Sequence, residues 1–258
     1  MAHLGGPMSR IALAGCALLC AALVAWFAAP PLARTAQRAG QQALAPADDD
    51  AGFEPIFDGK TLEGWDGDPA FWRVENGAIV AESKPEKPVA QNTFLIWRGG
   101  VLRDFELKLE YRLSDAANSG VQYRSQRVPG AGPWAMKGYQ ADMDGRDTYT
   151  GMVFEERGRG FLAPRGQFTR ITPGGVRKLI GVTGQPEELR AELKTGDWNR
   201  MHIIARGNLL LHVVNGRLMA ALIDEDSQGR SLDGLLGLQL HAGKPMRIEF
   251  RNLRLRRL

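Results

Sequence analysis

The stretch Phe105–Leu113 alternates between apolar and charged residues without a break. Every odd-numbered residue in it is apolar and every even-numbered residue is charged. A period of two places the two kinds of side chain on opposite faces of a β-strand, one against a core and one in water. A chain built on this pattern has to bury one face of each sheet against another layer.

Similar apolar–polar alternation recurs along most of the chain and predicts further strands. The strongest short hairpin signal is Asn215-Gly216, because both central positions of a type I′ turn need a positive φ. The predicted strands are Phe71–Val74, Ala78–Glu82, Phe94–Trp97, Val121–Arg124, Tyr139–Asp144, Met152–Glu155, Met201–Arg206, Leu209–Val214, Arg217–Leu222, Leu236–His241 and Met246–Leu255.

The last predicted strand changes the face of its apolar residues part of the way along. Met246 and Phe250 share one parity and Leu253 has the other, which predicts a bulge near Arg251-Asn252. Only Pro186–Leu193 has the composition of a short helix. Many short strands with Gly and Pro turns predict an all-β fold, a two-sheet antiparallel jelly-roll sandwich.

Residues 1–52 do not share this pattern. Arg10 precedes an apolar run, Ile11–Ala29, so residues 1–29 are predicted to be a signal peptide or an uncleaved N-terminal membrane anchor. Leu13–Cys16 also spells a lipobox, although the apolar run continues past Cys16. Each alternative implies export, to the periplasm, the cell surface or the membrane. Residues 30–52 are predicted to be a disordered tether, and residues 53–258 the folded domain.

Charge and cysteine content narrow the function of that domain. The chain has 33 basic and 29 acidic residues, but three arginines and no acid precede Asp48, so the rest is nearly neutral. Without a basic surplus to meet phosphates, nucleic acid is not an expected partner. Cys16 and Cys20 both lie in the leader, so the folded domain is expected to have neither disulfides nor thiol catalysis.

Three predicted strands carry hydrogen-bonding side chains, rather than ordinary charges, on one face. These side chains are Gln122 with Arg124, then Gln140 with Asp142 and Asp144, and finally Gln239 with His241. Such a face suits sugar hydroxyls, and Trp134, Tyr139 or Phe161 could supply an aromatic platform. Outward residues of any strand are polar, however, so an ordinary solvated face remains the alternative.

The segment Gly151–Gly160 contains Glu155 and Glu156 next to Arg157 and Arg159. These residues could form a surface ion-pair cluster of little energetic value. Alternatively, a carboxylate here could act as a base or a metal ligand.

No strong metal motif is present, and no cofactor is required by the sequence. Asp142 and Asp144, with Glu155, could make an all-oxygen site for a divalent cation such as Ca²⁺. Of the histidines after the leader, His202 and His212 lie within regular strands, and His241 at a strand end is the better functional candidate.

Nine short segments occur in the order in which they occur in the 3-keto-disaccharide hydrolase family, and together they span most of residues 53–258. The chain therefore resembles this family, formerly a domain of unknown function. The segments are Ile56–Trp65, Phe71–Ile79, Asp104–Leu107, Asn118–Arg124, Gly138–Asp142, Asp197–Asn199, Val214–Gly216, Gly237–Gln239 and Phe250–Asn252.

The resemblance implies a concanavalin A-like lectin/glucanase type of jelly roll and a hydrolase of 3-keto-disaccharides or 3-keto-glycosides. In this chemistry the C3 ketone acidifies the C2 proton, and its removal expels the C1 substituent. For this chemistry our hypothesis assigns Asp142, Glu155 or His241 as the acid or base. Substrate-binding residues would be Gln122, Arg124, Lys137, Tyr139, Gln140 and Gln239, with Arg124 and Lys137 stabilising charge.

One departure concerns the carboxylate. Many members have Gly-aromatic-Glu-x-Gln where this chain has Gly138–Asp142, so the carboxylate is displaced by two residues and stays on the same strand face. The alternative function is a non-catalytic carbohydrate-binding module. It would need the same polar face but no poised base. The expected partner in both cases is a carbohydrate, with the membrane reached only through the N-terminal segment.

Overall fold

A computed structural model of the chain describes residues 50–258. The predicted leader, and residues 30–49 of the predicted tether, lie outside the described residues. Within residues 50–258 no helix combines the length and apolar character that a membrane crossing requires.

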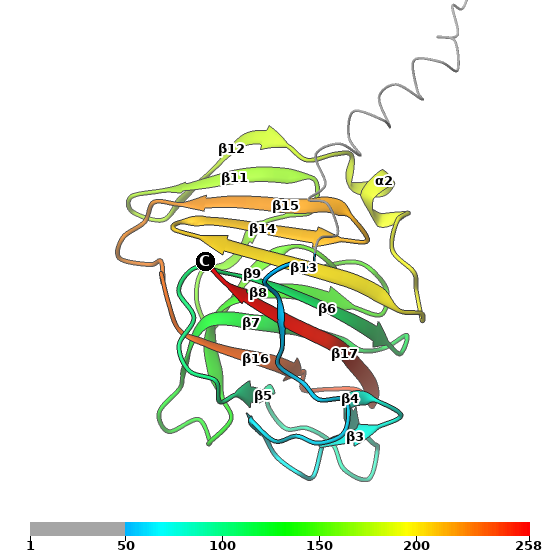
Figure 1. The fold of residues 1–258 in the computed structure, drawn as a ribbon. Helices are drawn as coiled ribbons and strands as arrows, with labels where there is room; N and C mark the ends of the chain where they lie inside the picture. The colour runs from blue at the N-terminus through cyan, green and yellow to red at the C-terminus, as the bar shows by residue number, and fades with distance from the viewer. Residues whose placement is uncertain (1–49) are drawn as a thin grey trace, which may run out of the picture. The chain divides into compact units, whose positions relative to one another are not determined.

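Two sheets face each other, and Figure 1 shows sheet A in front with β12 at its top and β3 at its bottom. Sheet A follows the order β12-β11-β15-β14-β13-β6-β17-β4-β3, and β1 also pairs with β17. Its strands are β1 (Glu54–Pro55), β3 (Trp72–Glu75), β4 (Ala78–Ser83), β6 (Phe105–Leu113), β11 (Gln167–Thr172), β12 (Val176–Val182), β13 (Asn199–Arg206), β14 (Leu209–Val214), β15 (Arg217–Asp224) and β17 (Met246–Arg257).

Sheet B lies behind it, in the order β10-β9-β8-β7-β16-β5-β2. All pairs in both sheets are antiparallel except β11 with β15. The fold is therefore the predicted all-β sandwich. The strands of sheet B are β2 (Trp65–Asp66), β5 (Thr93–Trp97), β7 (Asn118–Arg127), β8 (Met136–Asp144), β9 (Val153–Glu156), β10 (Gly160–Ala163) and β16 (Leu235–Leu240).

The structure agrees with the sequence predictions for single strands and turns. In β6 the odd-numbered residues are buried and the even-numbered ones are not. Asn215 and Gly216 both have positive φ, at 51° and 80°, between β14 and β15. The β17 register shifts between Arg251 and Arg254, with Asn252 at φ 54°, so the predicted bulge is confirmed. The one described helix, α2, covers Pro186–Arg190.

The core lies between the two sheets and also contains polar side chains that join them. The Tyr123 hydroxyl on β7 lies 2.8 Å from His212 Nε2 on β14, and His212 Nδ1 lies 3.1 Å from the carbonyl oxygen of Met152. The Tyr139 hydroxyl on β8 donates to Asp224 Oδ2 on β15, at 2.5 Å. These bonds satisfy groups that would be costly to bury alone.

A bulge in β7 changes the direction of one side chain. The β7–β8 register shifts between Tyr123 and Gln126, and Arg124 has a φ of 46°. Its guanidinium therefore points toward sheet A, where it donates to the carbonyl oxygens of Arg103 and Gly207. The prediction that Arg124 shares the face of Gln122 is wrong, because strict alternation does not continue through a bulge.

We expect His212 to make folding less favourable in acid. Burial lowers the pKa of His212 from 6.5 to about 4, so the folded protein excludes a proton that the unfolded chain binds. The free energy of unfolding should therefore lose about 2 kcal/mol from this residue between pH 7 and pH 5.

Urea unfolding of the wild type and of His212→Gln at both pH values isolates this effect, because all other groups titrate in both proteins. Equal pH dependence in the two proteins would contradict it.

Candidate functional site

A set of amide and carboxylate side chains lies on the outer face of sheet B, directed away from sheet A. We name this set the amide–carboxylate cluster, and its members come from four neighbouring strands. Each member is between 0 and 9% exposed. The members are Gln122 on β7, Gln140 and Asp142 on β8, Glu156 on β9 and Gln239 on β16.

A continuous network of hydrogen bonds connects the members of the cluster. Gln122 Nε2 donates to Gln140 Oε1 at 3.3 Å, and Gln140 Nε2 donates to Asp142 Oδ1 at 2.5 Å. Gln140 Nε2 also lies 3.5 Å from Gln239 Oε1, and Gln239 Nε2 donates to Glu156 Oε2 at 3.4 Å. The two carboxylates are thus linked through glutamine amides.

The contact between Gln239 and Glu156 shows that sheet B is cupped on this side. Their strands, β16 and β9, are separated by β7 and β8, which would place them about 14 Å apart in a flat sheet. Their side chains nevertheless meet. The polar groups therefore converge toward one point, as a binding site requires.

The side of this face above β5 and β16 is closed by apolar packing. Phe94, Ile96 and Met136 form a fully buried cluster there, and the backbone N–H of Phe94 donates to the carbonyl oxygen of Trp134. The connection between β7 and β8 therefore covers this side. Trp134 belongs to that cover, because its Nε1 donates to Asp66 Oδ1 at 2.9 Å.

Asn92, just before β5, extends the polar network beyond the sheet. Its Nδ2 donates to Glu156 Oε1 at 3.1 Å, and its Oδ1 accepts the backbone N–H of Ala242 at 2.9 Å. One residue earlier, Gln91 Nε2 donates to the carbonyl oxygen of Ala131 at 2.7 Å. The segment before β5 is therefore bound both to the cluster and to the connection between β7 and β8 that covers it.

The environment of Asp142 favours its protonated form. Burial raises the pKa of Asp142 from its usual 3.8 to about 8. This value already includes the hydrogen bond from Gln140, which lowers the pKa, and the negative charges of Asp144 and Glu156, which raise it. A carboxyl that keeps its proton near neutral pH can act as a proton donor.

Gln122 offers an acceptor to the cluster. Its Oε1 is buried and, within the described part of the chain, accepts no hydrogen bond. A buried carbonyl of this kind is normally paired, because leaving it unpaired costs roughly 1 to 3 kcal/mol. A sugar hydroxyl is a donor of the required kind.

Two predicted substrate-binding residues lie away from the cluster. Tyr139 is 1% exposed and points into the core, where it binds Asp224. Arg124 also lies between the sheets, with its Nη2 3.0 Å from Asp104 Oδ1. The structure does not bring either side chain together with Gln122, Gln140 and Gln239.

Glu155 and Glu156 point in opposite directions, because adjacent residues of a strand alternate. Glu155 pairs in register with Tyr139, whose side chain is internal, and forms an ion pair with Arg159 at 2.7 Å. Glu156 pairs with Gly138 and belongs to the cluster. Glu155 thus forms the predicted ion pair, but the pair is largely buried and does not lie on the surface as expected. Glu156 lies on the outer face, a position that the sequence analysis did not assign to it.

Asp144 closes the turn between β8 and β9. Its carboxylate accepts the backbone N–H groups of Thr148, Tyr149 and Thr150. Asp142 is bound by Gln140, so these two aspartates do not present a free pair of carboxylates to a cation. In residues 50–258 no group of three or more His, Cys, Asp and Glu side chains is arranged to hold a metal ion.

The two remaining predicted residues lie at the margin. His241 follows the end of β16, and its Nδ1 lies 2.5 Å from the carbonyl oxygen of Ala242, the residue whose N–H binds Asn92. Lys137 is exposed on β8 and pairs in register with Gln126. Among the described residues, neither has a hydrogen bond to the cluster.

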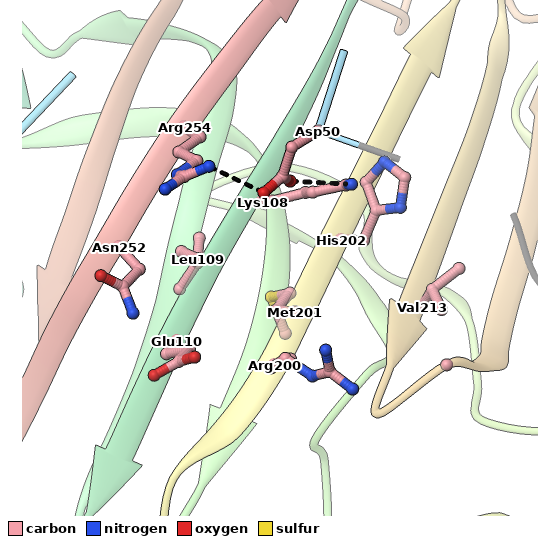
Figure 2. Close-up of a pocket in the computed structure, with 11 residues that line it drawn as sticks. Asp50, Lys108, Leu109, Glu110, Arg200, Met201, His202, Val213, Asn252 and Arg254 are labelled. Atoms are coloured by element: carbon pink, nitrogen blue, oxygen red, sulfur yellow. Dashed lines mark hydrogen bonds and ion pairs between the residues drawn. The ribbon is translucent and has the colours of Figure 1, made fainter. Parts of the chain in front are cut away.

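A cavity of about 310 Å³ lies on the opposite side of the protein, on the outer face of sheet A (Figure 2). Asp50 forms ion pairs with Lys108 and Arg254 there, and His202 lies 2.8 Å from Glu106. These charges neutralise one another. The arrangement is that of a solvated strand face, and it lacks the linked carboxylates of the cluster.

We expect Asp142 to hold a proton at pH 7. In carbon-13 NMR of the wild type, one carboxyl signal that is absent from Asp142→Asn should titrate near pH 8. Relative to the variant, the wild type should also lose stability as the pH rises from 3.8 to 8, because the unfolded chain then releases the proton that the folded state still holds. A midpoint near 4 would contradict the assignment.

The comparisons with known proteins agree with the architecture. The family described as "3-keto-alpha-glucoside-1,2-lyase-like domain" matches residues 52–256. A 3-keto-disaccharide hydrolase from Bacteroides thetaiotaomicron is 36% identical over 90 residues, which are 32% of this chain and 30% of that protein. The match therefore spans less than a third of the relative's length.

Two solved structures share the fold. A candidate glycosyl hydrolase from Parabacteroides distasonis has a TM-score of 0.53 at 19% identity, with 80% of this chain and 94% of that chain covered. A protein of unknown function with a galectin-like fold from Bacillus subtilis has a TM-score of 0.50 at 12% identity, with 76% and 90% covered. The jelly-roll prediction is confirmed, and the chain belongs to the 3-keto-alpha-glucoside-1,2-lyase-like domain family.

Proposed function

We propose that the chain cleaves 3-keto-glycosides, including 3-keto-disaccharides, at the amide–carboxylate cluster. The observation that carries this proposal is the pair of carboxylates, Asp142 and Glu156, linked through Gln140 and Gln239. Paired carboxylates in one buried network, one of which holds a proton, are suited to combined acid and base catalysis. The family description and the name of the Bacteroides relative support the choice of substrate.

In the proposed reaction, Glu156 removes the proton from C2, which the C3 ketone acidifies. The electrons of the C2–H bond first form a double bond between C2 and C3, which places negative charge on the C3 oxygen as an enolate. When the C3 ketone forms again, those electrons make the double bond between C1 and C2, and the bond between C1 and its substituent oxygen breaks. Asp142 gives its proton to that departing oxygen. Water can later add across the double bond and complete a net hydrolysis.

The enolate oxygen that develops at C3 needs hydrogen-bond donors. Arg124 is committed to backbone carbonyls between the sheets, so this role passes to amide groups of the cluster. The N–H groups of Gln140 and Gln239 already point at carboxylate oxygens. Neutral donors held in place before the substrate binds are effective at stabilising developing charge.

We expect Asp142→Asn and Glu156→Gln to lower kcat by at least about 100-fold, in line with the usual contribution of a general acid or base. Turnover of 3-keto-trehalose and methyl 3-keto-α-glucoside by the full-length chain is the measurement. The wild-type rate should fall as the pH rises through about 8, where Asp142 loses its proton.

Glu155→Gln is the matched control, because it changes the neighbouring carboxylate, which faces Arg159. Its kcat per folded molecule should stay within about threefold of the wild type. Full activity of Asp142→Asn and Glu156→Gln would disprove the proposed roles. Binding of both sugars without turnover by the wild type would instead indicate a carbohydrate-binding module.

We also propose that the chain is exported through residues 1–29. The support is the apolar run Ile11–Ala29 directly after Arg10. Cell fractionation should find the protein outside the cytoplasm, and N-terminal sequencing should distinguish a cleaved leader from an anchor. Recovery of the intact chain in the cytoplasm would contradict export.

A further inference from the structure

Three aromatic side chains lie beside the amide–carboxylate cluster, and we name them the aromatic patch. They are Tyr149, in the turn between β8 and β9, Phe154 on β9 and Phe161 on β10. The rings of Tyr149 and Phe161 are stacked at 5.4 Å, and Phe154 meets Phe161 edge-on at 5.0 Å. Tyr149 is 39% exposed and Phe161 37%. A stacked aromatic pair that remains in water gives up much of the stabilisation that burial would provide.

Strand register places the patch on the same face as the cluster. Phe154 pairs with Gln140 across β8 and β9, and Phe161 pairs with Phe154 across β9 and β10. Gln140 in turn pairs with Gln122. One row across sheet B therefore passes from hydrogen-bonding amides to aromatic rings, with about 4.8 Å between neighbouring strands.

The two sides of the cluster differ in how far they are covered. On the side of β5 and β16, Phe94 and Ile96 are 0 and 1% exposed under the covering connection. On the side of β9 and β10, the aromatic patch is open to solvent. Across the strands, a molecule longer than one ring with one end at the cluster therefore has room on the side of the patch and not on the side of β5.

The backbone around the patch is held in place before any ligand binds. Asp144 accepts the backbone N–H of Tyr149 at 2.7 Å, and Arg177 Nη1 donates to the carbonyl oxygen of Phe161 at 2.8 Å. Ordering the patch therefore adds little to the entropy lost on binding. Asp144 therefore positions the turn that carries Tyr149.

We propose that the aromatic patch is a second subsite, which binds the apolar C–H face of the leaving pyranose ring of a disaccharide. The inference rests on the proposed function, because it assigns the oxidised ring to the cluster and the leaving ring to the patch. A pyranose has an apolar face and a rim of hydroxyls, and aromatic rings with nearby polar groups match both features. The preferred substrates are then disaccharides rather than glycosides with a small C1 substituent.

Binding to Asp142→Asn tests the subsite without turnover. Calorimetry with 3-keto-trehalose should show that the further change Phe161→Ala raises Kd about tenfold, which corresponds to about 1.4 kcal/mol. The Kd for methyl 3-keto-α-glucoside, which has no second ring, should change less than twofold. Phe161→Trp should restore the affinity for the disaccharide, because it keeps an aromatic face. Tyr149→Ala should reproduce the selective loss independently.

Trp198→Ala is the matched control, since Trp198 is a partly exposed aromatic residue that packs against Arg112 on β6 and Arg251 on β17, two strands of sheet A. It should leave both Kd values unchanged. Equal losses for the two ligands, or no loss for either, would overturn the subsite, as would the absence of any sugar binding. Selective loss in a protein that shows no turnover would support the subsite and reject the proposed reaction, so the two can fail separately.

Discussion

Strands β7 and β8 have to satisfy two environments at once, and this constraint shapes the rest of the molecule. On their inner faces, Tyr123 and Tyr139 fill the core and bind side chains of sheet A. On their outer faces, Gln122 and Gln140 begin the amide–carboxylate cluster. Because successive side chains alternate, the residues that join the sheets also fix the position of the residues of the amide–carboxylate cluster.

The same constraint explains why burial extends to both faces of sheet B. A sheet in a sandwich usually presents one face to water, but the outer face of sheet B curves until β9 and β16 are in side-chain contact. The low-dielectric setting that results raises the pKa of Asp142. Electrostatic properties of the site therefore depend on the curvature of the sheet as much as on the identity of its residues.

Much of the fold could be predicted from local sequence patterns. The alternation in Phe105–Leu113, the Asn215-Gly216 turn and the β17 bulge are each determined by residues close in sequence. Gln122, Gln140, Asp142 and Gln239 were also found in this way, because each lies on a regular part of its strand. The resemblance to the family, which rests on nine segments in the same order, supported the prediction of a jelly roll.

Residues that depend on non-local geometry could not be found in this way. Arg124 lies one residue beyond regular pairing, where a bulge turns it inward, and the remaining residues of β7 are all polar, so no change of parity is visible. Glu155 and Glu156 are equivalent in composition, and only their partners on β8 distinguish them. Gln140 on the outer face pairs with Phe154, and Glu156 lies two residues after Phe154, so Glu156 also faces outward. This conclusion requires the register between β8 and β9, which the sequence alone does not supply. Asn92 reaches the cluster over 64 residues of sequence.

The burial of the cluster has a consequence for attempts to engineer this protein. Asp142 and Gln122 occupy positions where apolar side chains of similar volume would avoid a buried carboxyl and an unpaired carbonyl. Selection for thermal tolerance alone would favour such replacements, and each would remove a group that the sugar is proposed to need. Laboratory evolution without a sugar-dependent screen would therefore favour a more stable jelly roll that lacks the proposed site.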